Sequence, residues 1–354
     1  MIKYMLPFDG KGSNTAGVTR AENATRINNI DQSMLSVFQQ SWWVEIARGT
    51  ARYREAQVFE NGILIGSLPY VIRRGKLGVR WGASPDWSHL GGPVVSQSLS
   101  DEKKSDVLRQ LMAQLPRTIS FGFTCGPHSD DAHLIRQAFK NAGFVHSTEA
   151  TYSQSPEEAN VLGRMTRKHR LHIKAASRAL DIVEIPEDEF IVFYSLNLKE
   201  SAIESHGSLN VARDLIAKGR NGDTPQVRVT AAKRKKPGVP HDAAIACAWD
   251  KRRYYLWMST RRRHASNSPH DKPHPDAIKL LIVNAMEHAQ SLGRIFDADG
   301  FNTPGVKALY TQILGIPNEE FRDVFLRLTR IARWSKVFSA LYRRPKTVSP
   351  RGHT

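Results

Sequence analysis

Apolar residues recur at helical spacing between residues 275 and 292 of the chain. A helix with one buried face places apolar side chains three or four residues apart. Here the residues with that spacing are Ile278, Leu281, Ile282, Ala285, Met286 and Ala289. Gly293 follows at the point where such a helix ends. The pattern therefore predicts an amphipathic helix over this segment.

A short strand with acidic residues at its end follows the helix. Residues 295 and 296 are apolar, and Asp297 and Asp299 lie two positions apart, so both side chains project to the same side of a strand. Gly300 then lets the backbone turn sharply. Thr303 and Pro304 have the order of an N-cap and first-turn residue for a second helix. Helix, acid-tipped strand and helix form an α/β unit, and ligands of such units bind where strands end and helices begin.

The first half of the chain alternates between strand and helix patterns. Apolar runs at 56–60 and 63–72 flank Asn61-Gly62, a strong short signal of a β-hairpin. The other elements predicted in this half are a helix over 41–47, a strand near 77–81, a helix over 101–114, a strand over 118–124 and a helix over 130–141.

The second half opens with the sequence SPEE at 155–158, which is typical of a helix start. The helix predicted after it buries Val161, Leu162, Met165, Ile173, Ala176 and Leu180. Its basic residues Arg167, Arg170, Lys174 and Arg178 share another face. That face is either solvated or, since almost no carboxylates offset it, directed toward a polyanion.

Two further helices and a second hairpin follow. The helices are predicted over 188–205 and 209–218, and the strands over 227–232, 243–249 and 254–258. The order of hairpin and following helix is similar in both halves, which favours a duplication.

The order of these motifs resembles that of a known superfamily. Along the chain lie a Pro-His-Pro turn at 273–275, the predicted helix, Phe296-Asp297-x-x-Gly300, Pro304-Gly305, an aromatic-bearing short helix and Leu314-Gly315. This order is similar to the C-terminal half of the Fem-type acyltransferases, and most similar to the acetyltransferase-domain proteins of cellulose and capsule (exopolysaccharide) biosynthesis operons. The resemblance extends through 244–258 and 168–174, and covers most of residues 40–330.

The resemblance implies an α/β (α+β) fold of two tandem acetyltransferase-like (GNAT) domains, each a twisted mixed sheet flanked by helices. We expect a flexible N-terminal segment at 1–32, a first domain at 33–153, a second domain at 154–330 and a basic amphipathic tail at 331–354. A chain of 354 residues suits two domains of this size.

The net charge of the chain indicates an anionic partner but does not say which kind. The chain has 51 Lys and Arg against 34 Asp and Glu, a formal net charge of +17. Such an excess attracts polyanions, anionic membranes or phosphorylated ligands. The two cysteines, Cys125 and Cys247, lie in apolar strand-like segments without histidines at metal-ligand spacing, so we interpret them as core residues and expect no metal site.

The predicted donor site lies before the helix at 275–292. In acetyltransferase-like folds the pantetheine arm inserts between two diverging strands, and its pyrophosphate rests at the start of the next helix. The corresponding residues here are Arg261, Arg262, Arg263 and His274, which suit a phosphate-bearing acyl-CoA donor. The usual glycine-containing phosphate loop is absent, because no glycine lies between Gly238 and Gly293.

Four residues are candidates for catalysis. Asp297 and Asp299 are predicted to position an amine or a sugar hydroxyl, or else to cap the strand end. His264 is a candidate base, because its ordinary pKa lies near neutrality, or else an exposed loop residue. The resemblance implies that Tyr310 donates to a leaving thiolate, although packing against the sheet explains it equally well.

Four further residues are candidates for substrate binding. Trp87 and His89 lie in the long glycine-containing loop at 82–93, and such loops are often functional, although Trp87 also suits a residue that covers the core of the first domain. Glu204 and His206 form a second candidate pair in a loop that we expect to face the cleft between the domains.

The termini suggest a cytoplasmic protein. No apolar run approaches the ~18 residues that span a bilayer, and the first residues lack the apolar stretch of a secretory signal. The tail from Ile331 has an apolar side flanked by arginines and lysines, which suits either packing on the second domain or contact with the anionic inner face of a membrane.

The sequence therefore predicts an N-acyltransferase that moves an acyl group from an acyl-CoA-type donor to an amine on a sugar or a peptidoglycan (cell-envelope) precursor. One alternative is an aminoacyl-tRNA-dependent enzyme of the Fem type. A second, from another class, is a non-catalytic polyanion or nucleic-acid binding protein. A third is a degenerate member that only binds its partner.

Overall fold

The computed structural model describes residues 30–31, 35–48, 52–75, 78–127, 131–158, 160–200, 207–235, 238, 240–262, 272–299 and 304–329. Almost all of the N-terminal segment predicted as flexible, and the whole basic tail predicted at 331–354, lie outside these residues. Among the described residues no helix is long and apolar enough to cross a membrane.

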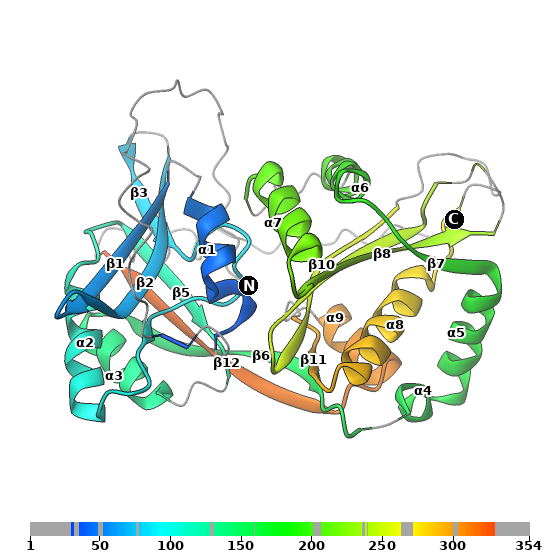
Figure 1. Cartoon of the computed structure of the whole chain (residues 1–354). Coiled ribbons are helices and arrows are strands. Elements are labelled where there is room, and N and C mark those ends of the chain that lie inside the picture. Colours follow the sequence, from blue (N-terminus) through cyan, green and yellow to red (C-terminus); the bar gives the residue numbers. More distant parts are fainter. Residues whose placement is uncertain are drawn as a thin grey trace, which may run out of the picture.

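The described strands form one mixed sheet of twelve strands that runs through the molecule (Figure 1). Its order is β1-β2-β3-β5-β12-β6-β11-β10-β9-β8-β7, and β4 pairs with β2. The strands of the first half are β1 (Tyr53–Glu60), β2 (Ile63–Arg74), β3 (Arg80–Ala83), β4 (Val94–Val95), β5 (Ser120–Cys125) and β6 (Val145–Gln154). Those that follow are β7 (Leu180–Glu184), β8 (Val227–Arg234), β9 (Ala243–Trp249), β10 (Arg253–Arg261), β11 (Ile295–Asp297) and β12 (Asn318–Leu328).

Helices cover the faces of the sheet in both halves (Figure 1). They are α1 (Ser41–Arg48), α2 (Asp101–Ala113), α3 (Ala132–Asn141), α4 (Val161–Arg164), α5 (Arg167–Ala179), α6 (Glu187–Glu200), α7 (Leu209–Asn221), α8 (Ala277–Ser291) and α9 (Pro304–Ala308). A 3-10 turn precedes α1 at Val37–Gln39, and a π-helical turn, Leu309–Ile313, follows α9. The predicted α/β class, with a mixed sheet flanked by helices, is confirmed.

Local chemistry explains where several elements begin. Asn61 and Gly62 have φ angles of 50° and 78°, which the tight turn between β1 and β2 requires, so the predicted hairpin is confirmed. Ser100 caps α2 by accepting a hydrogen bond from the amide of Lys103. Burial alternates along β5, which is the pattern of a strand with one face on the core.

The two halves repeat one arrangement of strands. In the first half an antiparallel set ends at β3, and α2 leads to the parallel strand β5. In the second half the antiparallel set β7 to β10 ends in the same way, and α8 leads to the parallel strand β11. This shared order supports the predicted duplication.

Strand β12 crosses the boundary predicted at residues 153 and 154. It belongs to the end of the chain, yet it pairs with β5 over Asp323–Leu328 and with β6 over Asn318–Leu326. The C-terminal strand thus completes the sheet of the first half, and β6 continues the sheet by pairing with β11. The division into domains at that boundary stays a prediction.

Residues of the first half also complete the core of the second. Trp43 of α1 and Trp87 of the loop before β4 belong to the buried cluster that contains Trp257 and the inner face of α7. The ring of Trp43 meets that of Trp257 with centroids 4.8 Å apart. Of the two interpretations of Trp87, the structure favours packing, but in the core of the second half rather than the first.

The helix predicted from Val161 to Leu180 is wrong in part. It breaks at Met165 and Thr166, because the Thr166 hydroxyl accepts from the amide of His169 and so begins the new helix α5. Leu180 belongs to strand β7. Cys125 and Cys247 are buried free thiols whose pKa burial raises to about 12, as expected of core residues.

Replacing Trp87 by alanine should lower the free energy of unfolding by about 3–5 kcal/mol, because it opens a cavity in the core that joins the halves. Urea denaturation measures this. Phe321→Ala on β12, where the ring is 57% exposed, is the control and should cost less than about 1 kcal/mol. Equal effects of the two substitutions would contradict the assignment of Trp87 to the core.

Candidate functional site

The strands β10 and β11 part shortly after they meet. Their parallel pairing covers only Arg253–Tyr255 and Ile295–Asp297, whereas β10 continues to Arg261. The register of β10 on β9 shifts between Tyr255 and Met258, which marks a β-bulge or irregularity at the same point. Beyond Tyr255 and Asp297 the backbone of β10 is therefore no longer paired with β11.

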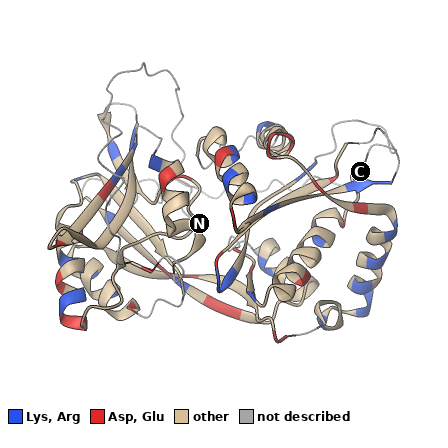
Figure 2. Ribbon diagram, in the orientation of Figure 1, with Lys and Arg blue, Asp and Glu red and all other residues tan. Residues whose placement is uncertain are grey.

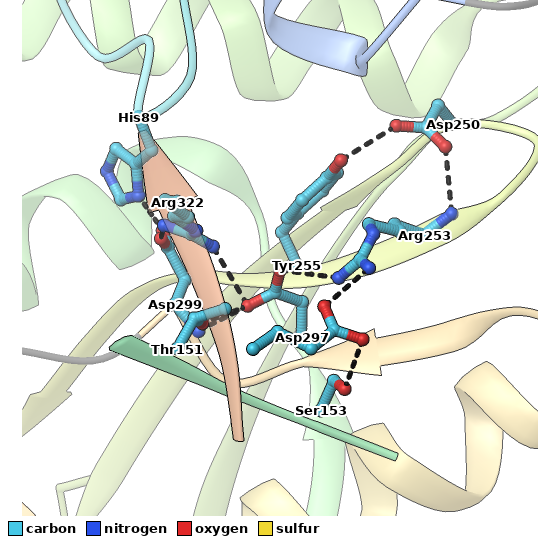
Figure 3. A network of polar contacts seen from close by, with 10 residues as sticks. His89, Thr151, Ser153, Asp250, Arg253, Tyr255, Asp297, Asp299 and Arg322 are labelled. Atoms are coloured by element: carbon cyan, nitrogen blue, oxygen red, sulfur yellow. Dashed lines mark hydrogen bonds and ion pairs between the residues drawn. The ribbon is translucent and has the colours of Figure 1, made fainter. Parts of the chain in front are cut away.

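A buried ion network lies where this pairing ends (Figure 3). Asp297 is fully buried, and its two oxygens accept from Arg253 Nη1 at 3.0 Å and from Arg322 Nη2 at 2.9 Å. Thr151 Oγ1 also donates to this carboxylate, at 2.6 Å. These partners come from β10, β12 and β6, so the carboxylate holds strands of both halves together.

The surroundings of Asp297 keep it ionised. Burial alone would raise the pKa of its carboxyl, but the guanidinium groups of Arg322 and Arg253 outweigh that effect and lower the pKa below its ordinary value. Arg253 also donates through Nη2 to Glu320 at 2.6 Å. The catalytic role predicted for Asp297 stays a prediction; its contacts make it the centre of the junction.

Asp299 and His89 meet at the rim of the same network (Figure 3). The carboxylate of Asp299 contacts His89 Nδ1 through one oxygen and Arg322 Nη1 through the other. Because a carboxylate only accepts, Nδ1 carries the proton of the neutral ring, and Nε2 is then the nitrogen that accepts a proton. The side chain of His89 is 27% exposed and stacks on Phe38, with ring centroids 5.5 Å apart. A histidine held by a buried carboxylate and open to solvent has the geometry of a general base.

Trp87 fixes the loop that carries His89. It has a φ of 65°, in the left-handed region that bulky residues rarely adopt. Its indole donates to Ser208 O at 2.7 Å, and its carbonyl accepts from Trp257 Nε1 at 3.0 Å, on the bulged segment of β10. At Gly207 a Cβ would lie 3.0 Å from the Trp87 indole nitrogen, a tighter contact than most Cβ atoms make, so the small residue suits this close approach. The loop therefore lies against β10 where the strands part.

A cavity of about 370 Å³ lies at the start of α8. It is lined by Arg261, Arg262 and His274, three of the predicted donor-binding residues, with Asp242, Pro273, Pro275, Ala277 and Ile278. The fully buried carboxylate of Asp242 accepts from Arg262 at 2.9 Å, from Arg234 at 3.1 Å and from the amide of His274 at 2.9 Å. The structure thus brings these three predicted residues together, and Arg261 is the exposed one.

A second cavity of about 370 Å³ lies between the halves. Residues from both sides line it, including Leu90, Lys104, Asp250 and Tyr255. Burial raises the pKa of Asp250, which accepts from the Tyr255 hydroxyl at 3.1 Å and from the amide of Arg253. The sequence indicated only that Asp250 lies between two predicted strands, because nothing in its neighbours indicates the cavity that it faces.

The remaining candidates fall into two groups. Tyr310 is buried beside Tyr152, with ring centroids 6.0 Å apart, and burial raises its pKa to about 12. Arg263, His264, Glu204 and His206 lie outside the described residues. Within the part of the chain that the structure describes, no group of three or more His, Cys, Asp or Glu residues could hold a metal ion.

Comparison with solved structures shows a shared fold. FemX aligns with a TM-score of 0.57 and 11% identity, over 85% of this chain and 94% of that chain. The C-terminal (DUF2156) domain of a putative lysylphosphatidylglycerol synthetase from Agrobacterium fabrum aligns with a TM-score of 0.52 and 13% identity, over 85% and 96%. A tandem GNAT protein from the clavulanic acid biosynthesis pathway has a TM-score of 0.43 and 12% identity, over 78% and 83%. No family model and no curated protein matches the sequence.

At these identities the likeness is one of fold, and the predicted Fem-like architecture is confirmed at that level. The similarity to proteins of polysaccharide operons stays a prediction.

Replacing Asp297 by asparagine should cost about 3–5 kcal/mol of unfolding free energy, because two buried guanidinium groups lose their counter-charge. Because the pKa of Asp297 is lower in the folded protein than in the unfolded chain, where it is about 4, the ionised carboxylate adds to the free energy of unfolding. This stabilisation is complete above the unfolded pKa and is lost as the pH falls through the folded pKa. Urea titrations at a series of acidic pH values should therefore show a steeper loss for the native protein than for Asp297→Asn.

Glu60→Gln serves as the control, since Glu60 pairs with Lys103 on the surface and both side chains are more than 40% exposed. It should leave stability unchanged. A small effect of Asp297→Asn, similar to that of the control, would refute the central role of the network.

Proposed function

We propose that this protein is an acyltransferase whose donor lies where β10 and β11 part. The observation that carries the proposal is that the β10–β11 pairing ends early, close to the His89–Asp299 pair, while a cavity lies at the start of α8. The amides at a helix start and the arginines beside them suit a phosphate, and the parting of the strands suits a narrow acyl arm.

The proposed reaction uses groups that the chain supplies. The acceptor amine attacks the carbonyl carbon of the acyl thioester while His89 Nε2 removes the amine proton. Backbone N–H groups of β10 beyond its last pair with β11 stabilise the oxyanion. The carbon–sulfur bond then breaks, an amide forms, and the thiol leaves with a proton. Asp299 positions the imidazole and stabilises it when it becomes charged.

The cavity between the halves is the proposed acceptor site. Leu90 lines it and directly follows His89, so an amine held there is close to the proposed base. Lys104, Arg252 and Asp250 give it charges of both signs, which suits a polar acceptor such as an amino sugar or a cell-envelope precursor. Both acceptors, and a role in polysaccharide biosynthesis, are proposals that rest on the resemblance of the sequence.

The Fem-type alternative has comparable support. The FemX fold and the basic helix α5 suit an aminoacyl-tRNA donor as well as an acyl-CoA donor, because either presents an activated acyl group beside phosphates. The non-catalytic alternative predicts binding to nucleic acid that falls steeply with salt, without turnover. Thermal shifts with acetyl-CoA, longer acyl-CoA and aminoacyl-tRNA separate these classes.

Arg261→Ala should weaken acyl-CoA binding by about tenfold or more, because it removes a charged donor from the cavity at the start of α8. Isothermal titration calorimetry measures the affinity. The control is Lys251→Ala, an exposed lysine in the turn between β9 and β10, and it should bind normally. Unchanged affinity in Arg261→Ala would move the phosphate site elsewhere.

His89→Gln should lower kcat by about 10²–10⁴-fold, the usual contribution of a general base, while donor affinity stays normal. The low-pH limb of the kcat–pH profile should disappear with it. A matched control is His146→Gln, since His146 contacts Asp323 at 2.7 Å in another His-Asp pair, on β6 and β12. If both variants keep full activity, His89 is not the base.

A further inference from the structure

The exposed face of α5 combines positive charge with an apolar side chain. Arg167, Lys168, Lys174 and Arg178 are exposed, and Figure 2 shows basic positions along the helix. The helix contains no acidic residue. Leu171 lies among these cations and is 56% exposed, although leucine is usually buried.

This face lies beside the proposed donor cavity. Helix α5 packs on α8, and His172 Nδ1 approaches Asp276 Oδ2, in the residue that precedes α8, to 3.4 Å. The pKa of His169 is lowered by burial and by the nearby charge of Lys279 in the first turn of α8. An anion bound along α5 would therefore lie near the start of α8, whose first residues line the cavity.

Among the described residues at and near the cavity, several cations are already bound to carboxylates. Arg262 and Arg234 are bound to Asp242, and Lys279 is bound to Asp276. Coenzyme A presents a pyrophosphate and a further phosphate, whereas a phosphopantetheine attached to a protein presents one phosphodiester. Among the described residues that line the cavity, Arg261 is the exposed arginine, and one exposed arginine suits a single phosphodiester.

We infer that α5 is the docking surface for an acidic helix of an acyl carrier protein, whose phosphopantetheine delivers the acyl group to the point where β10 and β11 part. The inference rests on the proposed function and names its donor. The thioester carbon–sulfur bond breaks, the acceptor nitrogen forms the amide, and the thiol stays on the carrier.

The apolar residues of α5 favour a protein over the other polyanions. A protein interface combines an apolar centre with a charged rim, which is the arrangement of Leu171 among basic residues. RNA bound through its phosphates gains nothing from an exposed leucine. One exposed leucine on a helix of 13 residues, about 20 Å long, is too small an apolar face to enter a membrane.

The test is a double substitution on α5 with a matched control on α6. Leu171→Ala with Lys174→Glu changes the proposed surface. Leu196→Ala with Lys199→Glu makes the same change on α6, where the leucine is 50% exposed and the lysine also lies three residues further on. Circular dichroism and thermal unfolding check that both variants fold.

Binding is measured by fluorescence anisotropy with a labelled bacterial acyl carrier protein that carries an octanoyl group, with octanoyl-CoA as competitor and labelled tRNA as a second probe. We expect the α5 variant to lose about tenfold or more in affinity for the carrier, and to keep its affinity for octanoyl-CoA. The α6 variant should bind the carrier as the native protein does.

The inference is overturned if the native protein does not bind the carrier, if the α5 variant binds it equally well, or if that variant loses only its affinity for tRNA. Octanoyl transfer to an amine, measured by mass spectrometry with both donors, tests the proposed function separately. If the protein transfers octanoyl from octanoyl-CoA but does not bind the carrier, the proposed acyltransferase function stands and the docking inference is wrong. If it binds the carrier through α5 but transfers octanoyl from neither donor, the proposed function is wrong.

Discussion

The two halves of this protein depend on a single carboxylate, that of Asp297, enclosed between the guanidinium groups of Arg253 and Arg322. Burying one charge in a protein interior costs several kcal/mol, so each of these groups requires the others. The arginines come from strands on either side of β11, and so the ion contacts determine which strands meet at the centre of the sheet. The pairing of β10 with β11 ends at this point.

The same junction makes the proposed site a product of both halves. Trp87 leaves the first half to fill the core of the second, and two residues later His89 meets Asp299. The orientation of the His89 imidazole therefore depends on how the Trp87 indole packs in the core of the second half. Because Arg322 binds both Asp297 and Asp299, the stability of the junction and the geometry of the proposed base share one guanidinium group.

The net charge of +17 has a structural counterpart. Many of the carboxylates that the structure describes are buried and bound to cations, as at Asp297, Asp242 and Asp323. A carboxylate that is buried and paired with its own cation does not neutralise the positive charge of lysines and arginines on the surface. The outer face of α5 is thus strongly basic although the interior ion pairs are balanced, and such a face attracts an anionic partner over about one Debye length.

The sequence by itself determined the α/β class, the β1–β2 hairpin and helix α8, because periodicity, turn residues and helix ends act over a few positions. It indicated His89 and Asp299 separately, yet no local signal connects residues 210 positions apart. The place of β12 between β5 and β6, the core position of Trp87 and the cavity at Asp250 follow only from tertiary structure. These features arise from strand pairing, packing and ion contacts between segments far apart in the sequence, which local sequence patterns do not predict.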